Sequence, residues 1–129
     1  MKTIKYTSHD RHWIIKRLKA FGYAIEGIKM AFVCELPVRI QVWSFALLCL
    51  LGIFLDWTWQ EWCLMLICST LIIVTEFINT ALEKLCDFIT LEHRPEIKYI
   101  KDLAAGAVLL QVITAFIVGW VLVIRPLFV

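Results

Sequence analysis

A row of acidic and amide side chains follows the second apolar stretch of the sequence. Glu76 comes directly after an apolar run, and Asn79, Glu83 and Asp87 follow it at helical spacing. At roughly 100° per residue, these side chains fall on one face of a helix. Oxygen ligands of this kind suit Mg²⁺, which usually keeps phosphate oxygens as well. With basic residues nearby, such a face suits phosphoryl transfer, which needs positioning, charge neutralisation and a base.

Glu76 is the acid that a simple structural role explains least well. From Trp62 to Glu76 is fourteen helical steps, or roughly 21 Å. In a hydrocarbon layer ~30 Å thick, that places Glu76 ~9 Å below the far surface, where a lipid hydroxyl can reach it. A helix end that emerges into water accounts for Asp87 and Glu83. It does not account for an acid inside the membrane, which is costly and by default functional.

Several well-known catalytic and metal-binding motifs are missing from the sequence. It has neither G-x-x-x-x-G-K-[ST] nor G-x-G-x-x-G, the two standard phosphate cradles. It also lacks H-E-x-x-H and G-x-S-x-G, which argues against a zinc protease or a serine hydrolase. The cysteines include no C-x-x-C pair, so we interpret them as packing residues and assign no metal to them. They are Cys34, Cys49, Cys63, Cys68 and Cys86.

The composition predicts an all-α membrane protein. Hydrophobic residues make up 61% of the 129 residues, and the mean hydropathy is +0.80. A chain this apolar cannot hide its surface in one small core. We predict one domain over residues 1–129. Its elements are an amphipathic interfacial helix at 10–34, ended by Pro37, and transmembrane helices at 38–55, 62–87 and 100–124.

The distribution of charge predicts the orientation of these helices. Nearly all the basic residues lie before the first span and in the 84–101 segment, whereas the 56–61 turn carries only acids among its charged residues. By the positive-inside rule, the N-terminus and the polar face are cytoplasmic, in a multi-pass inner-membrane protein. Glu35, Lys101 and Asp102 then join the polar face on the same side. The basic N-terminal segment favours anionic lipid over nucleic acid. No cleaved signal peptide is expected.

Two motifs resemble those of the small bacterial integral-membrane diacylglycerol kinase family. The first is Glu76-Phe-Ile-Asn-Thr-Ala-Leu-Glu83 with Asp87, and the second is Lys101-Asp102-Leu-Ala-Ala-Gly-Ala-Val. The similarity extends from Lys16 to the third span. It implies a homotrimer of three-helix subunits with shared active sites. It also implies transfer of the γ-phosphate of MgATP to the hydroxyl of a membrane lipid.

The resemblance also implies a role for each matching position. Glu76 is the general base, and Glu35 and Glu83 hold Mg²⁺. The remaining residues shape the nucleotide site: Lys16, Tyr23, Asn79, Glu92, His93, Arg94, Lys101 and Asp102. Four positions depart from the family pattern. Lys16 stands where arginine is common, Gln41 where diacylglycerol kinases often have an acid, and His93-Arg94 where Tyr-His is more usual.

The sequence also bears on which lipid alcohol accepts the phosphate. The Ala-Ala-Gly-Ala-Val run, the Asn79-Thr80-Ala81 form of the first motif and Glu61-Trp62 look more like the branch that phosphorylates undecaprenol. We therefore expect undecaprenol as the acceptor, with diacylglycerol as the alternative. Two non-enzymatic hypotheses remain for the same acids. One is a membrane assembly protein held together by its polar face, and the other is a small cation or proton carrier.

Overall fold

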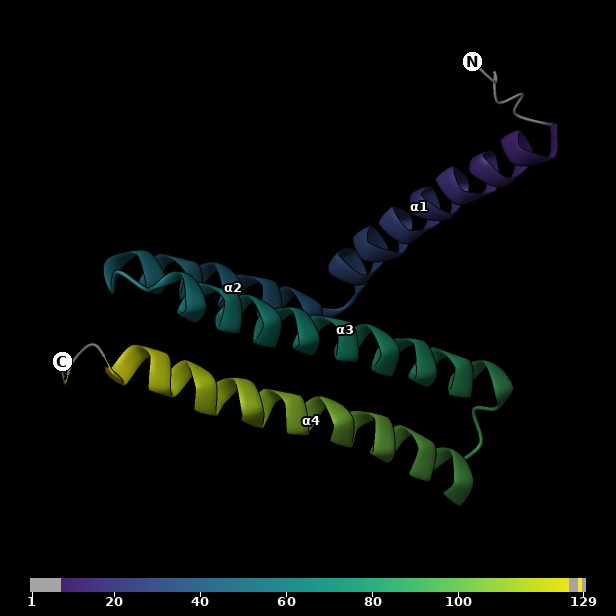
Figure 1. Ribbon diagram of the computed structural model, residues 1–129. Helices are drawn as coiled ribbons and strands as arrows, with labels where there is room; N and C mark the ends of the chain where they lie inside the picture. Colours follow the sequence, from purple (N-terminus) through teal and green to yellow (C-terminus); the bar gives the residue numbers. More distant parts are fainter. Residues whose placement is uncertain (1–7, 126–127, 129) are drawn as a thin grey trace, which may run out of the picture. The chain divides into compact units, whose positions relative to one another are not determined.

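The computed structural model describes residues 8–125 and 128, with side chains from Trp13 onward, and the regular elements of its described part are all helices (Figure 1). The helices are α1 (Ser8–Cys34), α2 (Leu36–Phe54), α3 (Trp59–Ile89) and α4 (Pro95–Ile124). The last three are long and apolar enough to cross a membrane. Even α2, with 19 residues, extends roughly 28 Å, close to the thickness of the hydrocarbon layer. The predicted all-helical class with three spans is confirmed.

Local sequence signals explain where the helices begin. Thr58 caps α3, because its hydroxyl accepts from the Glu61 backbone N–H while the Glu61 side chain accepts from the Thr58 backbone N–H. Pro95 starts α4, since proline suits the first helical turn. This start lies before the predicted residue 100, and α3 extends beyond its predicted range at both ends. Pro37 lies in the first turn of α2, with Glu35 alone between α1 and α2.

The chain forms two compact units, one ending at Leu36 and one beginning at Pro37, and each is described by itself. The first contains α1, whose apolar side chains from Ile14 to Phe32 are exposed. The Arg17 guanidinium lies 4.9 Å from the centroid of the Trp13 ring, a cation–π contact that shields an exposed aromatic surface. The interfacial position of α1 stays a prediction.

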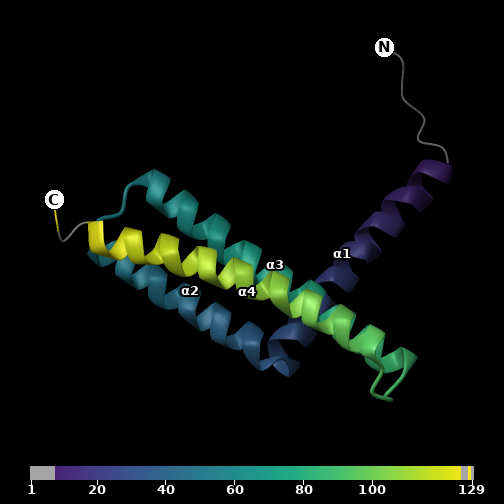
Figure 2. The same cartoon turned by 90° about the horizontal axis from the view of Figure 1, so that it is seen from below.

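The second unit contains α2, α3 and α4, and the antiparallel pair α3 and α4 packs most closely (Figures 1 and 2). Its buried apolar cluster lies at the end where the α2–α3 turn meets the end of α4. Trp57, Met65 and Leu122 form the centre, with side chains of all three helices around them. Gly52 permits this packing, because a Cβ there would meet the Trp57 ring at 2.5 Å. At the opposite end, residues 90–94 connect α3 to α4.

Candidate active site

One face of α3 changes from buried to exposed along its polar side chains. Glu76 is 6% exposed and Asn79 is 8% exposed, whereas Glu83 and Asp87 are exposed. The Asn79 amide nitrogen donates to Glu83 Oε1 at 3.4 Å, across one helical turn. The Asn79 amide oxygen is buried and has no hydrogen-bond partner among the described residues. This face therefore presents a buried acid and an acceptor oxygen that still lacks a donor or a cation.

The basic residues of α4 lie against this end of α3. The Lys101 ammonium contacts Asp87 Oδ1 at 2.5 Å, so that α3 and α4 are joined by an ion pair. Lys98 pairs with Asp102 one turn along α4. Both ion pairs are partly or largely exposed to water, which screens them. These ion pairs contribute little to stability, but they keep two cations and two carboxylates close together beside one pocket.

The loop between α3 and α4, residues 90–94, borders this region. The Thr90 backbone N–H donates to the Cys86 carbonyl at 3.1 Å, and the Glu92 backbone N–H donates to the Thr90 hydroxyl at 3.1 Å. Arg94 Nη2 donates to Glu92 Oε2 at 2.8 Å. A surface pocket of about 240 Å³ lies beside this loop and the first turns of α4. It is lined by Asp87, Thr90, Leu91, Glu92, His93, Arg94, Ile97, Lys98, Lys101 and Asp102.

The structure brings some of the predicted site residues together and leaves others apart. Five of the predicted nucleotide-site residues line the same pocket: Glu92, His93, Arg94, Lys101 and Asp102. Lys16, Tyr23 and Glu35 belong to the first unit, where Lys16 and Tyr23 are exposed and Glu35 is half-buried. Their meeting with the α3 face stays a prediction, as do the roles of all these residues.

The oxygen atoms on α3 are compatible with Mg²⁺. Among the side chains that the structure describes, from Trp13 onward, no three His, Cys, Asp or Glu side chains gather closely enough to form a metal site of their own. Mg²⁺ does not need such a site, because it often takes one or two carboxylates together with substrate phosphates and water. The Glu83 carboxylate and the buried Asn79 amide oxygen are donors of the required chemical type. The residues present therefore fit a cation that is brought with a nucleotide.

Sequence reasoning missed one charged residue that lines this pocket and the burial of two polar side chains on α2. Lys98 lines the pocket, and its spacing of four residues from Asp102 is a recognisable signal for a helical ion pair. On α2, Arg39 Nε and Gln41 Oε1 are buried without a hydrogen-bond partner among the described residues. No spacing rule predicts that burial, because it depends on how the helices pack.

The chain is similar to known proteins over most of its length. The family model described as "Prokaryotic diacylglycerol kinase" matches residues 22–123. The chain is similar to a protein named diacylglycerol kinase from Helicobacter pylori strain J99, with 39% identity over 81% of this chain and 83% of the relative. The corresponding protein of strain 26695 is 38% identical over 76% and 77%. An undecaprenol kinase from Bacillus subtilis is 28% identical over 84% and 89%.

Proposed function

The chain belongs to the prokaryotic diacylglycerol kinase family and is a membrane lipid kinase that uses ATP, and we propose that its acceptor is diacylglycerol. The product is then phosphatidic acid. Because the chain belongs to a kinase family, the kinase hypothesis is favoured over the hypotheses of a membrane assembly protein and of a cation carrier.

The choice of acceptor rests on which relatives are more similar to the chain, namely proteins named diacylglycerol kinase or a protein named undecaprenol kinase. The two Helicobacter pylori proteins named diacylglycerol kinase share 38% and 39% identity with the chain, against 28% for the undecaprenol kinase. The expectation that undecaprenol is the favoured acceptor is therefore not supported. One signal behind it was the Ala104–Val108 run. Small residues in a membrane span serve close helix contact, so they say little about the acceptor.

Glu76 is the residue we propose as the general base. Its carboxylate is buried on α3, one turn from Asn79. In the proposed reaction it takes the proton of the free lipid hydroxyl. The hydroxyl oxygen bonds to the γ-phosphorus, and the bond from that phosphorus to the β–γ bridging oxygen breaks, which leaves ADP. A base inside an apolar span suits an acceptor that is itself dissolved in the membrane.

The nucleotide is proposed to bind where α3, α4 and their loop meet. Lys101 supplies positive charge beside the α3 acids, while Asp102 and residues 92–94 line the same pocket. We propose Lys16 and Tyr23 of α1 as further nucleotide contacts. Glu35 and Glu83 would hold Mg²⁺, and Asn79 contributes its amide oxygen. When bound, the cation neutralises charge on the phosphates.

We also propose that the protein is a homotrimer with shared active sites and with its N-terminus in the cytoplasm. The concentration of basic residues before α2 and in the 84–101 segment, which contains the α3–α4 loop, supports this orientation. Two buried polar atoms on α2, Arg39 Nε and Gln41 Oε1, lack partners among the described residues. Polar groups inside a membrane generally find partners, and a neighbouring subunit is one source of them.

The test is transfer of labelled γ-phosphate from MgATP to diacylglycerol by the purified protein in mixed micelles. We expect Glu76→Gln to be inactive, because the substitution keeps the size of the side chain and removes the base. Asp56→Asn is the matched control. It makes the same acid-to-amide change in the α2–α3 turn, at the end away from the site. Asp56 has a φ of 50°, a conformation that asparagine also tolerates. The proposal is supported if the parent and Asp56→Asn transfer labelled phosphate to diacylglycerol and Glu76→Gln does not.

A further inference from the structure

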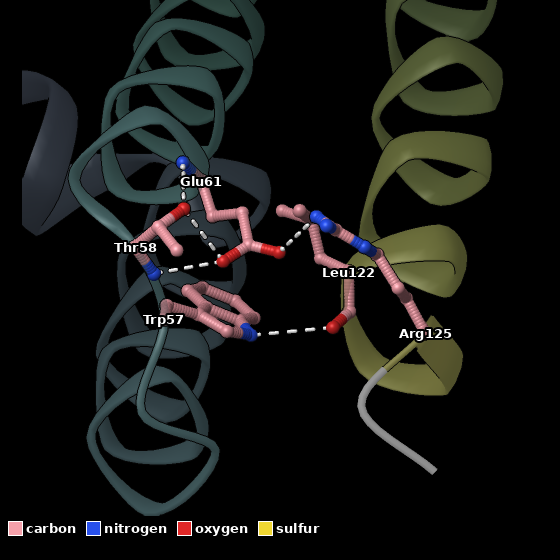
Figure 3. A network of polar contacts seen from close by, with 5 residues as sticks. All are labelled: Trp57, Thr58, Glu61, Leu122 and Arg125. Atoms are coloured by element: carbon pink, nitrogen blue, oxygen red, sulfur yellow. Dashed lines mark hydrogen bonds and ion pairs between the residues drawn. The ribbon is translucent and has the colours of Figure 1, made fainter. Parts of the chain in front are cut away.

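Two polar contacts join the α2–α3 turn and the start of α3 to the end of α4, at the end away from Glu76, and we call this group the turn clamp (Figure 3). It consists of the side chains of Trp57, Glu61 and Arg125 and the Leu122 carbonyl. Trp57 Nε1 donates to that carbonyl at 3.2 Å, between residues 65 positions apart. Arg125 Nη1 donates to Glu61 Oε1 at 3.0 Å. The clamp thus connects the start of α3 with the end of α4.

The Trp57 ring and the Glu61 carboxylate of the clamp each make further contacts with their surroundings. Trp57 is 6% exposed and packs with Met65 and Leu122, while Gly52 lies directly behind its ring. The second oxygen of Glu61 accepts from the Thr58 backbone N–H at 2.7 Å and from the Thr58 hydroxyl at 2.8 Å. Both carboxylate oxygens are therefore engaged, one with the cap of α3 and one with α4. In the ion pair, the Glu61 side chain is 12% exposed and the Arg125 side chain is 63% exposed, so only the carboxylate is shielded from water.

The remainder of the α3–α4 contact specifies the alignment of the two helices less strictly. Apolar packing has no directional bonds, and a Cβ added at Gly106 of α4 would meet nothing within 4 Å, so no close backbone contact fixes the alignment there. At the site end, the Lys101–Asp87 ion pair is partly exposed, with side-chain exposures of 34% and 53%. Long flexible side chains tolerate a shift of about an ångström, whereas the indole–carbonyl bond of the clamp weakens steeply on misalignment.

We propose that the turn clamp is a positioning device for the kinase site, an inference that rests on the proposed function. An α-helix is stiff along its axis, with a rise of about 1.5 Å per residue, so a slide at one end appears at the other. A slide of α4 would displace Lys101 and Asp102 relative to Glu76 and Asn79. A misplacement of about 1 Å can cost on the order of 100-fold in rate. Trp57, Glu61 and Arg125 touch no substrate and act through α4.

The test compares Trp57→Phe with Trp59→Phe in the full-length protein. The first variant keeps an aromatic ring and loses the donor to Leu122. The second makes the same change at a neighbouring residue that is 72% exposed. At a temperature where both are folded, we expect kcat for diacylglycerol phosphorylation to fall by about 5- to 20-fold in Trp57→Phe, a fraction of the cost of a full ångström. Trp59→Phe should match the parent.

A double-mutant cycle with Lys101→Ala separates positioning from general stability. If the clamp acts by placing Lys101, Trp57→Phe should cost clearly less once Lys101 is absent. Equal costs in both backgrounds would overturn the inference, as would a Trp57→Phe variant as active as Trp59→Phe. If Trp57→Phe does not fold, Arg125→Gln decides in its place, because that side chain is 63% exposed. Absence of transfer by the parent itself would instead refute the proposed function.

Discussion

Replacing Asn79 by leucine is expected to stabilise the protein while it weakens the enzyme. Asn79 is 8% exposed, and its amide oxygen has no hydrogen-bond partner in the described part of the chain. A buried acceptor left unsatisfied costs about 1 to 3 kcal/mol. The amide nitrogen recovers little of this, because its contact with Glu83 is long at 3.4 Å. Leucine fills a similar volume, so we expect the free energy of unfolding to rise by about 1 kcal/mol.

The same change removes an oxygen that we propose for the nucleotide site. A hydrogen bond or ion contact to a charged group contributes about 1.5 to 3 kcal/mol. Its loss corresponds to a decrease of roughly 10- to 150-fold in kcat/KM for ATP. A polar residue retained at a cost in stability, and needed for activity, is what a functional site requires.

Unfolding by SDS in mixed micelles measures the stability, and steady-state kinetics at saturating diacylglycerol measures kcat/KM for ATP. Thr114→Val is the control, because the Thr114 hydroxyl donates to the Leu110 carbonyl at 2.9 Å and is already satisfied. We expect that variant to change stability and activity little. An Asn79→Leu protein that is less stable than the parent, or one with full activity, would refute the reasoning.

The other predictions concern the base, the nucleotide and the metal. Glu76→Gln should keep the fold and lower lipid phosphorylation by at least ~100-fold, the lower scale of general-base catalysis; turnover close to that of Asp56→Asn would remove Glu76 from this role. Lys101→Ala should raise the KM for ATP, because it removes the cation that lies against Asp87, and an unchanged ATP dependence would contradict this. Glu35→Ala and Glu83→Ala should each raise the Mg²⁺ concentration needed for half-maximal activity, and an unaltered magnesium titration in both would defeat the metal assignment.

Much of the fold was predictable from the sequence, because membrane spans depend on length and composition. The apolar runs that became α2, α3 and α4 are long enough to cross a bilayer, and this property is local. The residue at which α4 begins was harder to predict from the sequence. The segment after Pro95 is polar and resembles a loop, although proline is favoured in a first helical turn.

The polar face of α3 was also predictable in part, because helical spacing alone places Glu76, Asn79 and Glu83 together. The pairing of Asp87 with Lys101 was not, since it depends on the alignment of two antiparallel helices. The turn clamp shows the same limit. Thr58 and Glu61 form a capping box that the sequence displays, but the bond from Trp57 to Leu122 connects distant residues through their packing. The acceptor lipid depends on contacts that no local pattern records.

The most direct test of the central claim is a comparison of acceptors with one preparation of the protein. Diacylglycerol and undecaprenol are offered separately with MgATP in the same detergent mixture, and kcat/KM is measured for each by formation of the phosphorylated lipid. The account predicts efficient formation of phosphatidic acid and a markedly lower kcat/KM for undecaprenol. A higher kcat/KM for undecaprenol would contradict the proposed acceptor while leaving the lipid kinase intact. Phosphorylation of neither lipid would contradict the account as a whole.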